Sequence, residues 1–119
     1  MIAGVHTIIY AEDAEQARAF FRDVLGFSSV DAGDGWLIFV LQPGELAFHP
    51  GDAVQHEVFF ICHDIERTVV DLKKKGVEFT APISEARYGL MTRFKVPGAG
   101  EIGLYQPTHP SPLAGFSTG

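Results

Sequence analysis

The residues best suited to do chemistry are a histidine and a glutamate that occupy equivalent places in two similar stretches of the chain. His6 lies in the apolar run at residues 5–11, and Glu57 lies in a second run of the same kind. Aligning Asp13 with Asp64 gives an offset of 51 residues, which also superposes Glu57 on His6. Polar side chains in strands that are otherwise apolar need polar partners. We therefore expect His6 and Glu57 to face one cleft, where they would hydrogen-bond a polar group of a ligand.

An internal repeat positions these two residues. Residues 5–27 have the pattern of a strand, a capped helix and a stop: Asp13 is a predicted N-cap, an apolar stripe follows at helical spacing, and Gly26 ends the helix. A second stretch repeats this order, with Asp64 as the cap and Gly76 as the closing glycine. The later parts of both units also match. The chain therefore divides into two similar units, each with the element order βαβββ.

The alternation of apolar runs and turn residues predicts an α+β fold with two helices, at residues 13–25 and 64–75. The predicted strands cover residues 5–11, 28–30, 36–41 and 45–49 in the first unit, and residues 77–80, 90–96 and 101–106 after a strand that begins at His56 in the second. We expect one domain at residues 1–107, made of units at about 1–52 and 53–107, and a tail at 108–119. The polar link at residues 81–89 is a candidate rim over a pocket.

The composition restricts the partners and the location of the protein. A net charge of −6 argues against nucleic acid or an anionic membrane as a partner. No signal peptide and no apolar run of about 20 residues is visible, which favours a cytoplasmic protein. Cys62 is the sole cysteine, so an intramolecular disulfide is impossible, and its apolar neighbours suggest a buried thiol without a nucleophilic role.

Several motifs resemble the vicinal oxygen chelate superfamily, which includes glyoxalases, bleomycin-resistance proteins and extradiol dioxygenases. They are His6 followed by Asp13, the FFRDVLGF end of the first helix, the HDIERTVVDLKKKGVEF segment and VPGAGEIGLYQP. The resemblance covers about residues 4–107. It implies two tandem βαβββ modules that form a U-shaped mixed sheet around a small-molecule cleft. It also implies a homodimer, with the cleft inside one chain or between two.

The resemblance places metal ligands on the first and fourth strands of each module. The first-strand positions are His6 and Glu57, and the fourth-strand positions are Ala47 and Gly103, which carry no donor atom. Two protein ligands alone would hold a divalent ion such as Zn, Ni, Fe or Mn weakly. Glu57 would also be the candidate catalytic group. A one-residue register slip would place His56 in the cleft instead.

Other donors stand close to the positions that lack one. They lie two residues away along the same strands, roughly 6 to 7 Å, so they could complete a metal shell only through a strand shift or a water molecule. These donors are Glu45, His49 and Glu101. If His6 binds metal, affinity should fall as the pH drops through the histidine pKa of about 6.5.

The remaining candidates would form the walls of a substrate or ligand site. Arg93 is a charged residue inside an apolar strand, so it must face water or meet an anion such as a carboxylate or phosphate. For the aromatic residues, plain core packing is the alternative. The candidate wall residues are Trp36, Phe39, Tyr88, Met91, Arg93 and Tyr105.

Two functions remain open from the sequence. One is a metal-dependent lyase or dioxygenase, in which the cation binds two adjacent oxygens of the substrate. The other is a metal-free protein that binds or sequesters a small molecule, such as an antibiotic or another aromatic or cationic compound. The acidic composition and the aromatic candidates suit the second. The metal content of the purified protein separates the two.

Overall fold

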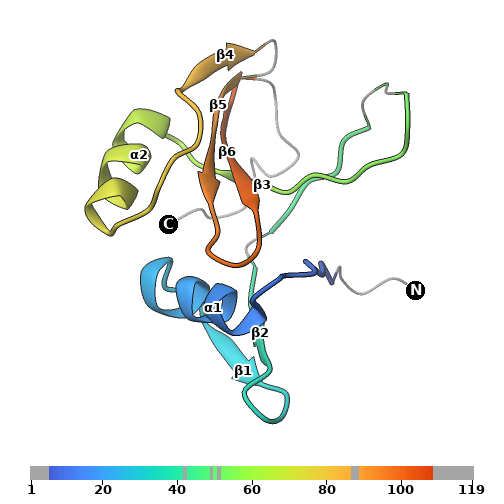
Figure 1. The fold of residues 1–119 in the computed structure, drawn as a ribbon. Coiled ribbons are helices and arrows are strands. Elements are labelled where there is room, and N and C mark those ends of the chain that lie inside the picture. The colour runs from blue at the N-terminus through green and yellow to red at the C-terminus, as the bar shows by residue number, and fades with distance from the viewer. Residues whose placement is uncertain (1–5, 42, 49, 51, 87–88, 109–119) are drawn as a thin grey trace.

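The computed structural model describes residues 6–41, 43–48, 50, 52–86 and 89–108. Figure 1 shows the elements in order: α1 (Ala14–Ala19), the π-helix η1 (Phe20–Val24), β1 (Ser29–Asp31), β2 (Leu37–Phe39), β3 (Phe59–Ile61), α2 (Ile65–Lys74), β4 (Ser84–Ala86), β5 (Gly89–Lys95) and β6 (Glu101–Pro107). β1 and β2 form an antiparallel pair, and the other strands form a four-stranded sheet in the order β3-β6-β5-β4. β3 is parallel to β6, while the remaining pairs are antiparallel. The predicted α+β fold with a mixed sheet is confirmed.

Both helices begin at the predicted aspartate caps. The Asp13 carboxylate accepts a hydrogen bond from the Gln16 N–H at 3.0 Å, and the Asp64 carboxylate accepts one from the Arg67 N–H at 3.1 Å. Gly76 follows α2 with a φ of 89°, as expected of a closing glycine. The first helix changes from α to π geometry after Ala19, a wider turn that the apolar spacing did not predict.

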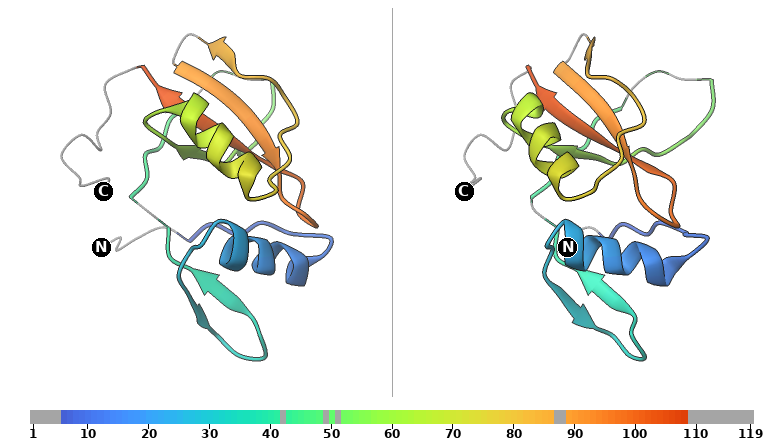
Figure 2. Two further views of the ribbon diagram at one scale, coloured as in Figure 1. Left: turned by 90° about the vertical axis from the view of Figure 1, so that its left-hand side faces the viewer. Right: turned by 60° about the vertical axis from the view of Figure 1, so that its left-hand side comes forward.

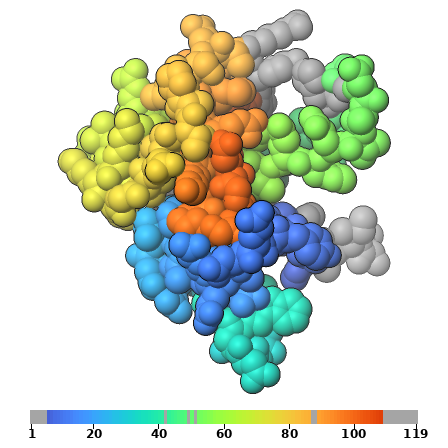
Figure 3. Space-filling model, viewed as in Figure 1, coloured from blue at the N-terminus to red at the C-terminus, as the bar shows by residue number. Residues whose placement is uncertain are grey.

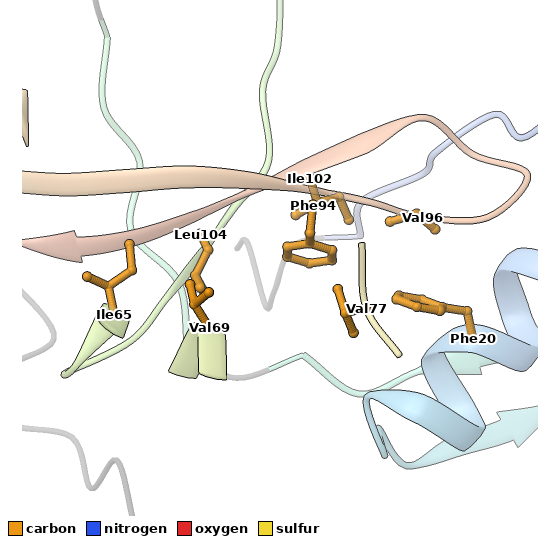
Figure 4. Packing of buried hydrophobic residues seen from close by; sticks show 8 residues of the cluster. All are labelled: Phe20, Ile65, Val69, Val77, Phe94, Val96, Ile102 and Leu104. Carbon is orange, nitrogen blue, oxygen red and sulfur yellow. The ribbon is translucent and has the colours of Figure 1, made fainter. Parts of the chain in front are cut away.

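The hydrophobic core joins the two units. It covers one face of the four-stranded sheet, and Figure 4 shows Phe20 of η1 pointing toward side chains of the second unit. The Phe20 and Phe94 ring centroids are 6.5 Å apart. Each fully buried aliphatic or Phe side chain contributes about 1.5–3 kcal/mol relative to exposure. The buried set is Phe20, Ile65, Val69, Val77, Phe94, Val96, Ile102 and Leu104.

Three of the four strands that the sequence predicts in the second unit are present, with shifted limits. The predicted strand at residues 77–80 is reduced to a bridge between Phe79 and Phe94, and the link at 81–89 contains β4. The turn between β5 and β6 reaches down to the start of α1, where the two units meet in Figure 3. The assignment of residues 1–107 to one domain stays a prediction.

The first unit differs from its prediction at both outer strands. Residues 6–11 and 45–48 form no strand with other described residues, so the predicted strands at 5–11 and 45–49 are wrong for their described residues. Their apolar side chains stay in solvent, with Tyr10 92% and Phe48 91% exposed. A strand forms only where another strand satisfies its backbone groups, and the described residues of this single chain supply no such partner here. The tandem-module detail is therefore not fully confirmed.

Within the described ranges, no helix has the length and apolar character needed to cross a membrane.

Candidate functional site

One face of the four-stranded sheet carries most of the side chains that could bind a ligand. Figure 2 shows α2 lying along the other face, which is the core face. Because side chains alternate along a strand, the residues between the core positions point away from α2. We call this surface the Arg93 face, and it consists of Glu57, Phe59, Ile61, Met91, Arg93, Gly103 and Tyr105.

The strand register arranges this face in two rows. Phe59 lies opposite Gly103, which in turn lies opposite Arg93. The next row places Tyr105 between Ile61 and Met91 in the same way. One row therefore contains the cation, and the neighbouring row is apolar.

Gly103 is what brings Phe59 and Arg93 together. These two residues stand on strands separated by β6, so their backbones are roughly 9 to 10 Å apart. The Arg93 guanidinium carbon nevertheless lies 5.2 Å from the centroid of the Phe59 ring, within the range of a cation–π interaction. A Cβ atom at position 103 would clash with that ring. The missing side chain lets Phe59 lie across β6 and support the guanidinium.

Arg93 also forms an ion pair with Glu57. The Arg93 Nη2 atom lies 3.3 Å from Glu57 Oε1, a contact at the long end for a hydrogen bond. The side chains are 39% and 50% exposed. An ion pair this open to water is worth about 0–1 kcal/mol. The pair neutralises both groups without holding either of them tightly.

The apolar row supplies an aromatic surface beside this ion pair. The Phe59 and Tyr105 rings meet edge to face, with centroids 6.1 Å apart. Ile61 is 38% exposed, and Met91 is partly buried. Flat aromatic compounds bind well to such surfaces, since rings and thioethers offer large contact areas.

The donors predicted to bind metal do not come together in the part of the chain that the structure describes. His6 is exposed in unpaired chain, and Glu57 pairs with Arg93. The Glu101 carboxylate accepts a hydrogen bond from the Thr80 hydroxyl. Among the described residues, no three His, Cys, Asp or Glu side chains are grouped so that they could hold an ion.

The fourth-strand positions do not supply the missing metal ligands. At position 103 the Phe59 ring fills the space that a ligand side chain would need, and Ala47 is exposed and has no donor. Glu45 lies in chain that forms no strand, and His49 is outside the described residues. The residues present do not fit a metal centre of the kind that the resemblance implies, and metal binding by His6 and Glu57 stays an untested prediction.

The predicted wall residues divide into two groups. Met91, Arg93 and Tyr105 share the Arg93 face. Phe39 instead packs against Phe21, with ring centroids 5.6 Å apart, which is the core-packing alternative. Trp36 sits in the exposed turn before β2. Tyr88 lies outside the described residues.

Two members of the Arg93 face were missed in the sequence. Phe59 and Ile61 follow Glu57 at the two-residue spacing of a strand, which was the available signal. Gly103 was recognised as a position without a donor, but its role in making room for Phe59 depends on the pairing of three strands.

Cys62 directly follows β3 and packs against the hydrophobic core, not on the Arg93 face. Its thiol is half-buried, with Sγ 3.7 Å from the Tyr105 carbonyl oxygen. Burial raises the pKa of the Cys62 thiol, a hydrogen bond with Thr68 opposes this, and the charge of Asp64 adds to the rise. A raised pKa leaves little thiolate at neutral pH, so a nucleophilic role is disfavoured.

Two hollows on the described part of the surface lie away from the Arg93 face. One of about 310 Å³ lies between α1 and the β5–β6 turn, and another of about 390 Å³ lies between Gly26 and Val40. No residue of the Arg93 face lines either hollow. Among the residues that line them, neither hollow has a grouping of charge and aromatic rings comparable with that of the Arg93 face.

Comparison with known proteins supports the relationship suggested by the motifs. The chain is 28% identical over 109 residues to the uncharacterized protein YetH of Bacillus subtilis (strain 168), covering 80% of this chain and 91% of YetH. Its fold matches TnmS3, described as an antibiotic binding protein from Streptomyces sp. CB03234, with a TM-score of 0.65, 21% identity and coverage of 90% and 98% of the two chains.

A superfamily member from Sphaerobacter thermophilus DSM 20745 matches with a TM-score of 0.62, 25% identity and coverage of 88% and 98%. The model of the glyoxalase/bleomycin resistance protein/dioxygenase superfamily matches residues 5–101. The chain therefore belongs to the glyoxalase/bleomycin resistance protein/dioxygenase superfamily.

Proposed function

We propose that this protein is a metal-free small-molecule binding protein that receives an aromatic compound on the Arg93 face. This is the second of the two functions left open by the sequence. The metal-dependent enzyme is the less well supported function, because its ligand positions carry Gly103 and Ala47 and its candidate carboxylate, Glu57, is paired with a guanidinium.

One observation carries the proposal: the Phe59 ring lies across Gly103 and beneath the Arg93 guanidinium. This arrangement uses the fourth-strand position for an aromatic surface instead of a metal ligand. Small-molecule sites are mostly apolar and aromatic, with a few polar groups that orient the ligand. Phe59, Tyr105 and Met91 supply the first feature, and the Arg93–Glu57 pair supplies the second.

TnmS3 shares the fold and is described as an antibiotic binding protein. A shared fold does not transfer a function by itself. The proposal therefore rests on the contacts of the Arg93 face, and the relationship adds only that this architecture can host ligand binding.

Ligand binding can be mapped by nuclear magnetic resonance with naphthamide, a neutral planar aromatic probe. We expect it to shift the amide signals of Phe59, Met91 and Tyr105 and to leave those of Val69 and Leu72 on α2 unchanged. A probe that shifts no signal of the Arg93 face would contradict the proposal.

The metal alternative is tested separately by elemental analysis and by titration with Zn²⁺, Ni²⁺ and Mn²⁺. We expect the wild type to bind less than one ion per chain and to show no heat of binding that His6→Ala or Glu57→Ala abolishes. Stoichiometric metal that is lost in both variants would replace this proposal with the metal-dependent one.

A further inference from the structure

We infer that Arg93 gives this site a preference for aromatic compounds that carry an anionic oxygen group, such as a carboxylate, and that Glu57 holds the place of that group in the free protein. This inference rests on the proposed function and deepens it by naming the ligand class.

The Arg93 guanidinium lies over an aromatic ring, and its charge is only loosely neutralised. The Phe59 ring supports the guanidinium at 5.2 Å, while the contact with Glu57 involves one nitrogen at 3.3 Å. A guanidinium presents several N–H donors in a planar fork that matches a carboxylate. A ligand carboxylate can therefore make a shorter, two-point contact that Glu57 does not make.

Glu57 can be displaced from Arg93 at little cost. Its side chain is already 50% exposed, so it returns to water without leaving a buried charge behind. The exchange replaces one carboxylate with another at the same cation. Little of the binding free energy is then lost in breaking the resting pair.

The apolar row of Ile61, Tyr105 and Met91 lies directly beside the Phe59–Arg93 row in the sheet register. An aromatic ring placed over Tyr105 and Met91 would bring a carboxylate on its edge to Arg93. The polar and apolar parts of the ligand class thus have neighbouring places on one surface.

The charged residues around the Arg93 face favour an anionic ligand over a cationic one. Lys95 is the next cation along β5, and it lies opposite Glu101 at the end of the face, away from the apolar row. Glu57 is the carboxylate that Arg93 contacts in the described part of the chain. A cationic ligand would be repelled by the Arg93 guanidinium. An anionic ligand would be attracted to it.

The experiment compares three probes that share one ring system: naphthoate, naphthamide and naphthylmethylammonium. Dissociation constants are measured for each by calorimetry at pH 7 and low salt, with the wild type and with Arg93→Met, Glu57→Gln and Lys95→Gln. Lys95→Gln is the matched control, since it removes a positive charge from the same strand and leaves Phe59 and Arg93 in place. Melting curves check that each variant is folded.

We expect the wild type to bind naphthoate roughly tenfold more tightly than naphthamide, which is typical of one charge-assisted contact. Arg93→Met should reduce that ratio to about one, and Lys95→Gln should retain it. Glu57→Gln should tighten naphthoate binding, because it removes the competing carboxylate. This last variant keeps the inference testable even if Arg93→Met does not fold.

Equal binding of naphthoate and naphthamide, a preference for naphthylmethylammonium, or weaker naphthoate binding by Glu57→Gln would each overturn the inference. Any of these results leaves the proposed aromatic-binding function standing. Failure of all three probes to bind would count against the proposed function as well.

Discussion

The backbone N–H of Asp13 donates a hydrogen bond to the carbonyl oxygen of Gly98 at 3.0 Å, joining the cap of the first helix to the turn between β5 and β6. The same aspartate accepts the capping hydrogen bond from Gln16. Gly98 has a φ of 81°, and a Cβ atom there would lie 2.5 Å from the Asp13 carbonyl oxygen. This contact explains how two units with similar sequences are held together at one point outside the core.

Gly98→Ala should destabilise the protein by about 2–4 kcal/mol, since it combines backbone strain with a clash against Asp13. Gly100→Ala is the matched control: its φ is 75°, and nothing lies within 4 Å of the added Cβ. Gly100→Ala should lower the free energy of unfolding by about 1 kcal/mol, from backbone strain alone. Urea unfolding of both variants measures the difference, and equal losses would show that the Asp13 contact does not matter.

Gly103→Ala should displace the Phe59 ring and destabilise the protein by about 1–3 kcal/mol, as overpacking does. In the double variant Phe59→Ala/Gly103→Ala the clash is absent, so the two free-energy changes should not add. Gly44→Ala, where the added Cβ meets nothing within 4 Å, is the control. Additive losses in a double-mutant cycle would mean that the ring does not occupy the position 103 space.

Cys62 should react slowly with iodoacetamide at neutral pH, because burial raises the pKa of its thiol. The rate in the folded protein should increase with pH and reach its midpoint above the ordinary thiol value of about 8.5. The protein unfolded in urea is the control and should titrate near that ordinary value. A folded midpoint at or below it would contradict the expected direction.

The raised pKa of the Cys62 thiol also predicts how the free energy of unfolding depends on pH. A thiol whose folded pKa is raised stabilises the fold fully below the unfolded pKa, and this contribution is lost as the pH rises from the unfolded value through the folded one. Unfolding free energies of the wild type should therefore fall in that alkaline window by more than those of Cys62→Ser. Parallel pH profiles for the two proteins would show that Cys62 is not the group responsible.

Homodimerisation is expected from the apolar side chains that the first unit leaves in solvent. Tyr10 and Phe48 lie on the two segments that the sequence predicts to be strands, and a second copy can supply the neighbouring strands that the described residues of this chain do not. Light scattering at micromolar concentration should give twice the chain mass. Phe48→Asp should lower that mass, while Val70→Asp on the exposed side of α2 should not. A monomeric wild type would refute the expectation.

Local sequence determined the helices of this protein. Asp13 and Asp64 cap them through contacts three residues away, and an apolar stripe selects the buried face of each. Such contacts depend on spacing along one segment, so they can be predicted without knowledge of the rest of the fold. The apolar patterns at residues 90–96 and 101–106 predicted β5 and β6 for the same reason.

The tertiary structure decided the candidate site and the incomplete sheet of the first unit. Phe59, Gly103 and Arg93 meet only because β6 lies between β3 and β5 in one register, and a shift by one residue would turn each side chain to the opposite face. Residues 6–11 have the composition of a strand but no ladder partner among the described residues of the chain. Strand pairing and register arise from contacts between segments distant in sequence, whereas helix formation and capping are satisfied within a single segment.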